Sequence, residues 1–365
     1  MISKFFKNFQ LNDYANNEIN TTSNKNGKII DCSLGTNPFI DSKDLREKLS
    51  SIIYDINSYP SYSEYNSLKK TLCDFWYKKT FVTLNLNNIS FSTGTRSILK
   101  IINNFFLDKN CLVLGYSPQF SRYVSEVKLR ESNYIDYKLS LESNYKFIVN
   151  DFIKYIDRQY DLIYIDNPNN PTGQIISIED IELIANLAKK YNTYIVIDEA
   201  YGDYMDDSNS AISLMNKYTN IIILRSATKF YGLANLGIGY IVANEEIIEL
   251  FDKANIMFPI SDFACKAFAY SIQNEDLISH TKQLVQENKK KLISSLDSKN
   301  FLYTDFRTPI FTIYSTKYDH LANKLIEYNV ISESCEGFDN LNSKYTRIRI
   351  PKEIDSLIMI LKKVL

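Results

Sequence analysis

Several residue types are scarce in this 365-residue chain, and each scarcity argues against a class of protein. The only two histidines, His280 and His320, lie far apart, so neither a histidine-based catalytic triad nor a zinc site is expected. The five cysteines are scattered and odd in number, and they form neither a CxxC pair nor a disulfide framework. This cysteine usage indicates a reducing cytoplasm. Glycine occurs only ten times, so we expect it where the backbone geometry demands it.

The chain also lacks an excess of either charge and has no long hydrophobic run. Its 42 basic and 43 acidic side chains give a net charge of −1, which offers no electrostatic reason to expect a nucleic acid or an anionic membrane as partner. No stretch of roughly 18 apolar residues is present to span a membrane. The N-terminus has no apolar run of the kind found in a signal peptide. A hydrophobic content of 45% is nevertheless ample for a packed core.

The middle of the chain predicts strands that alternate with helices. Short apolar runs that end at polar or turn residues predict buried strands at 111–115, 161–166, 194–198 and 221–224. Between the second and third strands, Ser177 is a candidate helix N-cap. The apolar face of that helix comprises Ile181, Ile184, Ala185, Leu187 and Ala188. This pattern predicts an α/β fold with a mostly parallel sheet, which binds ligands at the carboxyl ends of its strands.

The C-terminal third has a different pattern. Strand-like runs at 309–314 and 346–350 follow helical segments rich in Lys and Glu, and a last helix is expected at about 353–364. We therefore expect a large α/β domain over residues 49–262. A small α+β domain is expected to combine both termini, residues 1–48 and 263–365.

Three motifs follow predicted strands. They are Asn-Pro-Asn-Asn-Pro-Thr-Gly at 167–173, Asp-Glu-Ala-Tyr at 198–201, and Arg-Ser-Ala-Thr-Lys-Phe-Tyr-Gly-Leu-Ala at 225–234. Alone, the first also fits an ordinary turn before a helix, and a lysine after a strand is usually solvated. Their order is more specific, because Asp198 follows Asn170 by 28 residues and Ser226 follows Asp198 by another 28.

In this order the motifs resemble the fold-type I aminotransferases that use pyridoxal 5'-phosphate (PLP), a class I/II family. The branch that they resemble contains histidinol-phosphate aminotransferase and threonine-phosphate decarboxylase. The resemblance spans nearly the whole chain and adds Thr36-Asn37-Pro38, Ser58-Tyr59-Pro60, Thr93-Gly94-Thr95, Ser117-Pro118-Gln119-Phe120 and Arg347-Ile348-Arg349-Ile350. It implies a PLP enzyme, with pyridoxamine 5'-phosphate as an intermediate form, that acts as a cytoplasmic homodimer with shared active sites.

The resemblance also implies how the cofactor ring is held. Lys229 matches the lysine that forms the Schiff base. Asp198 matches the carboxylate that keeps the ring nitrogen protonated, while Glu199 would point to the opposite face of its strand. Asn170 and Tyr201 match the donors to the phenolic oxygen. The aromatic ring that stacks on the cofactor corresponds to Phe120.

The cofactor phosphate is expected at the N-terminus of the helix that begins near Gly94, where free amides and the helix dipole favour an anion. Hydroxyl donors would come from Thr95, Ser226 and Thr228. Tyr59 resembles the family tyrosine that reaches the phosphate bound by the neighbouring subunit.

Substrate contacts are expected near both ends of the chain. Arg347 matches the arginine that grips a substrate α-carboxylate with a bidentate fork. Arg349, two residues further along a strand, would share its face, although it also fits a plain surface arginine. The resemblance adds Asn37, and no metal is expected.

One departure from the family pattern is large. Relatives of this branch usually have an arginine that contacts the cofactor phosphate in the run after the lysine, and Gly237 stands at that position here. A buried phosphate dianion without a cation is unfavourable, so another residue should replace the arginine. We expect Arg96, in the first turn of the phosphate-binding helix, to do so, with Arg225 as second choice.

The expected reaction is transfer of an amino group from an amino acid, L-glutamate above all, to a small phosphorylated keto substrate. The alternative is decarboxylation of a phosphorylated amino acid such as phosphoserine or phosphothreonine. Residues 228–231 and 334–338 resemble the decarboxylases more than most aminotransferases. A non-catalytic PLP-binding regulator is disfavoured, since Lys229 is present and the cofactor motifs begin by residue 37, too early to leave room for a DNA-binding module.

Overall fold

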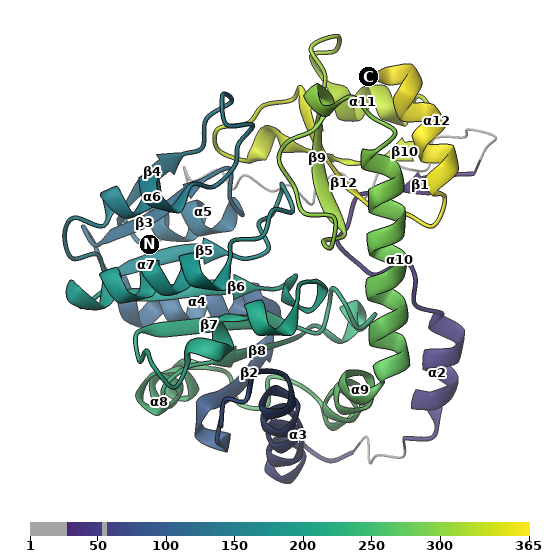
Figure 1. Cartoon of the computed structure of the whole chain (residues 1–365). Helices are drawn as coiled ribbons and strands as arrows, with labels where there is room; N and C mark the ends of the chain where they lie inside the picture. The colour runs from purple at the N-terminus through teal and green to yellow at the C-terminus, as the bar shows by residue number, and fades with distance from the viewer. Residues whose placement is uncertain (1–27, 53–56) are drawn as a thin grey trace, which may run out of the picture.

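The computed structural model describes residues 28–52 and 57–365. A seven-stranded sheet with helices on both faces forms the larger part of the molecule, and a smaller unit holds the C-terminus (Figure 1). The large sheet has the order β2 (Ile89–Thr93), β8 (Ile238–Val242), β7 (Ile221–Ser226), β6 (Tyr194–Glu199), β5 (Leu162–Asp166), β3 (Leu112–Ser117) and β4 (Asn133–Lys138). All neighbours run parallel except β8, which is antiparallel to both β2 and β7. The predicted α/β class with a mostly parallel sheet is confirmed.

The helices of the larger part cover the two faces of this sheet. They are α3 (Tyr62–Thr80), α4 (Gly94–Phe106), α5 (Arg122–Lys128), α6 (Val149–Phe152), α7 (Ile178–Lys190), α8 (Glu245–Ala254) and α9 (Asp262–Gln273). The predicted helix after Ser177 is α7, and the Ser177 side chain accepts a hydrogen bond from the Asp180 amide. The four predicted strands are also present, each ending at or up to two residues beyond the predicted end.

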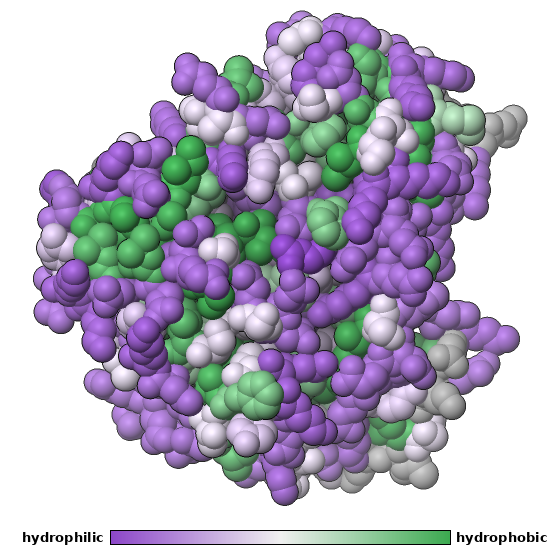
Figure 2. Space-filling model, in the orientation of Figure 1, coloured by the Kyte–Doolittle hydropathy of each residue, from purple (hydrophilic) through white to green (hydrophobic). Residues whose placement is uncertain are grey.

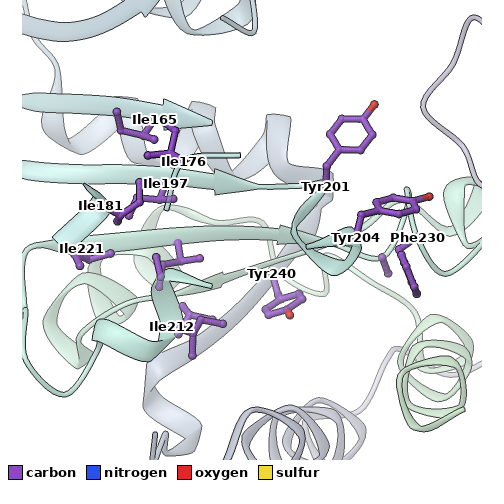
Figure 3. Packing of buried hydrophobic residues seen from close by; sticks show 14 of the residues in the cluster. Ile165, Ile176, Ile181, Ile197, Tyr201, Tyr204, Ile212, Ile221, Phe230 and Tyr240 are labelled. Atoms are coloured by element: carbon purple, nitrogen blue, oxygen red, sulfur yellow. The ribbon is translucent and has the colours of Figure 1, made fainter. Parts of the chain in front are cut away.

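Alternate residues of the buried strands belong to two hydrophobic clusters, one on each face of the sheet. Ile165 and Ile197 lie in the cluster that includes α7, with the isoleucines of neighbouring strands beside them (Figure 3). Tyr164 and Val196, one residue earlier, lie in the cluster formed with α4, α5 and α8. This alternation decides on which side of the sheet each polar residue at a strand end emerges.

The smaller unit is built on a three-stranded sheet of β11 (Glu333–Ser334), β12 (Tyr345–Arg349) and β9 (Ile310–Tyr314). A separate cluster packs it against α10 (Glu275–Ile293), α11 (Leu321–Ile326) and α12 (Ile354–Val364). The N-terminal β1 (Ile30–Asp31) pairs in parallel with β10 (Val330–Ile331), so this early segment joins the late one. From there the chain leads to α2 (Ser42–Ser50).

The predicted domain boundaries stay a prediction. Residues 1–27 of the expected small domain lie outside the described residues. Helix α9, placed in the small domain by the sequence, contributes Ala264, Cys265 and Phe268 to the cluster that also contains Trp76 of α3. None of the described helices is long and apolar enough to cross a membrane. Hydrophilic residues cover most of the face of the molecule seen in Figure 2.

Candidate active site

The carboxyl ends of β5, β6 and β7 meet the start of α4 around a pocket of about 220 Å³. Its lining includes ten of the eleven residues predicted to bind the cofactor: Gly94, Thr95, Arg96, Phe120, Asn170, Asp198, Tyr201, Ser226, Thr228 and Lys229. The exception is Tyr59. The structure therefore gathers residues that are more than 130 positions apart in the sequence, whereas the roles assigned to them stay predictions.

Asp198 and Glu199 emerge on opposite sides of the sheet, as the strand alternation predicts. Asp198 lines the pocket, whereas Glu199 lies on the other face and is fully buried against Arg225. The Asp198 carboxylate accepts hydrogen bonds from the Ala200 amide (2.9 Å) and from the Tyr123 hydroxyl (3.0 Å). Burial raises the Asp198 pKa to about 6, against the lowering effect of these two bonds.

Lys229 and two aromatic residues form another part of the pocket. The Lys229 Nζ lies 5.9 Å from the ring centre of Tyr201. The backbone carbonyl of Lys229 accepts a hydrogen bond from the Tyr204 hydroxyl (3.3 Å). Tyr201 and Tyr204 follow the end of β6 beyond the isoleucine cluster (Figure 3). The Phe120 ring meets the Tyr123 ring edge to face, with their centres 5.5 Å apart.

The N-terminus of α4 opens onto the same pocket. Gly94 adopts a left-handed φ of 77°, and Thr93 at the N-cap makes no side-chain hydrogen bond to the first amides of the helix. Strand β8 lies very close, because a Cβ on Gly239 would come within 2.5 Å of the Gly94 carbonyl carbon. Such a helix start favours an anion. Nearby, the hydroxyl oxygens of Ser226 and Thr228 are 2.7 Å apart.

The position of the missing family arginine is adjacent to this helix start. A Cβ on Gly94 would lie 3.8 Å from the Gly237 carbonyl oxygen, and Gly237 itself has a left-handed φ of 62°. Arg96 is exposed and is one of the residues that line the pocket.

The second choice, Arg225, was wrong. Its guanidinium is buried on the opposite face of the sheet, where it donates to Glu199 (2.7 Å) and Asp203 (2.6 Å) and lies 4.7 Å from the Trp76 ring centre. Removing a buried arginine from two carboxylates would leave those charges uncompensated.

The predicted substrate residues lie beside the pocket rather than in its lining. Arg347 is buried and donates to the Asn170 side-chain oxygen (2.9 Å) and to the Ser33 carbonyl (2.7 Å). Arg349 donates instead to backbone carbonyls, among them that of Leu34 (2.8 Å), and Asn37 donates to the Phe230 carbonyl (2.7 Å). Arg347 is thus the one of the three that bonds directly to a lining residue.

Tyr59 lies at the surface, with 84% of its area exposed, and stacks on Phe258 with ring centres 5.6 Å apart. Tyr59 is therefore not among the residues that line the pocket of its own chain.

Four further residues line the pocket that were not predicted as site residues: Tyr123, Asp166, Pro168 and Ala200. Asp166 had a detectable signal, because it ends a predicted strand directly before the Asn-Pro motif. For Tyr123 the only sequence signal was its position three residues after Phe120, a spacing that places two side chains on one face of a helix.

Comparison with known proteins agrees with this geometry. The family model described as aminotransferase class I and II matches residues 28–359. Histidinol-phosphate aminotransferase 2 of Archaeoglobus fulgidus is 27% identical over 90% of this chain and 90% of its own. The solved histidinol-phosphate aminotransferase of Clostridium acetobutylicum has a TM-score of 0.81 at 22% identity, covering 92% of this chain and 99% of its own. That of Sinorhizobium meliloti, solved in complex with PLP, has a TM-score of 0.77 at 18% identity and covers 92% of this chain and 91% of its own.

The fold and the pocket together define a fold-type I PLP enzyme. The chain belongs to the aminotransferase class I and II family and is a PLP-dependent aminotransferase, as its motifs predicted.

The residues present fit this cofactor. The pocket combines a lysine, an aromatic ring, an uncapped helix start for the phosphate, and a buried carboxylate whose two described hydrogen-bond partners are donors. A carboxylate surrounded by donors is suited to remain ionised, as a partner for a protonated ring nitrogen must.

Proposed function

We propose that this enzyme transfers the amino group of L-glutamate to a small phosphorylated keto substrate, with pyridoxamine phosphate as the alternate form of its cofactor. The observation that carries the proposal is that Arg347 bonds to Asn170, which lines the same pocket as Lys229 and Asp198. The arginine that we expect to bind the substrate carboxylate therefore contacts a residue that lines the same pocket as the lysine. Relatives named histidinol-phosphate aminotransferase support a phosphorylated acceptor.

Bound PLP would supply an electron sink for the negative charge that develops at the substrate α-carbon. Lys229 Nζ would serve as the general base and acid that moves the proton from the substrate α-carbon to C4′ of the cofactor. Asp198 would hold the proton on the ring nitrogen. Asn170 and Tyr201 would donate to the phenolic oxygen, and Phe120 would cover the ring.

Arg347 binds the α-carboxylate of the amino donor through its two terminal nitrogens. Those nitrogens donate to Asn170 and to the Ser33 carbonyl in this structure, so the guanidinium is already oriented by the pocket wall and by the N-terminal segment. Arg349 and Asn37 tie that segment to β12 and to the residue after Lys229.

We further propose a cytoplasmic homodimer. An exposed patch supports the dimer: Tyr59, Tyr62, Ile256 and Met257 are each more than 60% exposed, and Phe258 packs between the two tyrosines. Such contiguous apolar surface marks interaction sites, and a second copy would bring this Tyr59 to the partner's phosphate. Five free cysteines without a disulfide support the cytoplasm.

A half-reaction tests the proposed function. Purified enzyme loaded with PLP is mixed with L-glutamate, and the absorption of the bound cofactor is followed. We expect conversion to the pyridoxamine form and recovery of the original spectrum with 2-oxoglutarate.

The Lys229→Ala variant is the control and should not turn over, because it lacks the group that moves the proton. Carbon dioxide release from phosphothreonine, without accumulation of the pyridoxamine form, would instead establish the decarboxylase. Turnover by Lys229→Ala would refute the assignment of this lysine.

A further inference from the structure

The carboxylate predicted to hold the cofactor ring nitrogen does not stand alone. Asp166 on β5 is directly opposite Asp198 on β6 in the parallel register, and both residues line the pocket. Residues opposite each other on neighbouring strands share a face of the sheet, and their strands are about 4.8 Å apart. Two buried acids therefore lie side by side on the floor of the pocket.

Both carboxylates are surrounded by donors. Asp166 accepts bonds from the Tyr116 hydroxyl (2.7 Å), the Asn169 amide group (3.1 Å) and the Asn170 backbone amide (2.9 Å). Asp198 accepts from the Ala200 amide and from the Tyr123 hydroxyl. Burial raises the pKa of both acids, whereas these donors oppose it, because a protonated carboxyl would need an acceptor for its own hydrogen.

The two neighbours of Asp198 act on it in opposite directions. The Tyr123 hydroxyl donates to the Asp198 carboxylate, and a hydrogen bond to the charged form makes the acid easier to ionise. The negative charge of Asp166 has the reverse effect, because like charges at close range disfavour one another.

We propose that Tyr123 and Asp166 are positioning residues that together set the proton affinity of Asp198, and thereby its strength as the partner of the ring nitrogen. This inference rests on the proposed role of Asp198 in PLP binding. It assigns to Tyr123 and Asp166 a function that neither the motifs nor the family comparison supplies.

The groups that act on the Asp198 carboxylate come from several elements of the described part of the chain. From β5 comes Asp166, from α5 Tyr123, from the loop after β7 Lys229, and from its own strand end the Ala200 amide. Lys229 favours the ionised form as Tyr123 does, and burial opposes it. Tyr123 is itself held rigidly, since its ring stacks on Tyr164 with centres 4.8 Å apart and planes at 5°.

The test is the pH dependence of PLP affinity, measured as a dissociation constant by titration of the cofactor-free enzyme. Affinity should fall as the pH drops through the Asp198 pKa, because the protonated acid no longer pairs with a protonated ring. We expect Tyr123→Phe to move this midpoint up and Asp166→Asn to move it down. A hydrogen bond to a charged group corresponds to a shift of about one pH unit or more, a tenfold change in affinity at fixed pH.

Tyr134→Phe is the matched control. Tyr134 is a partly buried tyrosine on β4, the edge strand of the same sheet, and its hydroxyl donates to the neutral Gln119 side chain (2.7 Å), so its loss should leave the midpoint in place. Should Asp166→Asn fail to fold, Tyr116→Phe replaces it. Removing the Tyr116 hydroxyl makes Asp166 easier to protonate and so reduces its negative charge. The Asp198 midpoint should therefore move down, as it does in Asp166→Asn.

A PLP analogue whose ring nitrogen is replaced by CH separates electrostatics from packing. With this analogue the affinity should no longer fall as the pH drops through the Asp198 pKa, because no protonated ring nitrogen is present to pair with the carboxylate. The inference would be overturned by midpoint shifts of the same sign in both variants, by no shift in either variant, or by the same fall in affinity with the analogue. Failure of the wild-type enzyme to bind PLP would instead refute the proposed function.

Discussion

Arg96 is the residue that we expect to replace the arginine missing at position 237. It lines the pocket in the first turn of α4, near Gly237, which stands where the family resemblance leads us to expect an arginine. A cation in the first turn of a helix is unfavourable against the helix dipole unless an anion lies nearby. We therefore expect Arg96 to contact the phosphate of PLP or, failing that, of the substrate.

Replacing Arg96 with Ala should weaken PLP binding by about tenfold or more, because a hydrogen bond to a charged group contributes roughly 1.5–3 kcal/mol. The dissociation constant of PLP and the substrate KM are the measurements. Adding Gly237→Arg should restore part of the loss only. Although a Cβ at Gly237 meets nothing within 4 Å, its left-handed backbone costs a non-glycine residue about 1–2 kcal/mol. Unchanged PLP affinity together with an unchanged substrate KM in Arg96→Ala would contradict this role.

At the scale of elements, the segment between β1 and α2 holds the two parts of the molecule together at the pocket. Its carbonyls at Ser33 and Leu34 accept bonds from Arg347 and Arg349, and Asn37 donates to the Phe230 carbonyl. Gly35, in the middle, is buried so close to Tyr201 that a Cβ would lie 1.9 Å from the tyrosine hydroxyl oxygen. The segment therefore approaches the pocket only because this residue has no side chain.

Gly35→Ala should displace the Tyr201 hydroxyl and weaken PLP binding by about tenfold, the magnitude of one lost hydrogen bond of about 1.5 kcal/mol. In a Tyr201→Phe background the same change should cost less, because the hydroxyl that it displaces is already absent, although Cζ at 2.8 Å still has to move. The double-mutant cycle thus measures the coupling between the two residues. Equal losses in both backgrounds would mean that Gly35 acts through the backbone alone.

At the scale of the whole molecule, the exposed patch around Met257 predicts the oligomeric state. Met257→Asp places a charge beside Phe258, whose ring contacts Tyr59 and Tyr62, and desolvating that charge in an interface is costly. We expect a dimeric wild type, a largely monomeric variant, and weaker PLP binding in the variant because the partner's Tyr59 is lost. Sedimentation or light scattering measures the mass. Met359→Asp is the control, since Met359 is similarly exposed but lies on α12. A monomeric wild type would contradict the proposal.

The stability of the cofactor-free protein should also depend on pH through Asp198. Burial raises its pKa from 3.8 to about 6, so the unfolded chain releases this proton near pH 4 and the folded chain near pH 6. Stability from this group is therefore lost as the pH rises from about 4 to about 6, by roughly 3 kcal/mol, and is constant above that range.

Asp198→Asn removes this dependence. The variant should therefore gain stability relative to wild type at pH 7 compared with pH 4.5, as measured by the free energy of unfolding in urea. PLP binding by this variant is impaired. The exposed Asp74, changed to Asn, is the control and should show little difference between the two pH values. A relative stability of Asp198→Asn that is the same at both pH values would mean that Asp198 has an ordinary pKa.

Sequence patterns alone were enough to predict the strands at the centre of the sheet, the helix after Ser177, the family, and most of the residues that line the pocket. These features are local: apolar runs of strand length, an N-cap, and motifs such as that around Lys229, placed directly after a strand end. Because parallel strands bring their carboxyl ends to one edge, placing a motif on a strand end is enough to place it in the site.

Tertiary structure decided what depends on partners distant in the sequence. Arg225 was a candidate phosphate ligand until the fold paired it with Glu199 and Asp203 on the far face of the sheet. The position of Asp166 opposite Asp198 follows from strand register, and the bond from Tyr123 follows from the packing of α5. Strand register and helix packing arise from contacts between segments far apart along the chain, so a motif within one segment does not predict them.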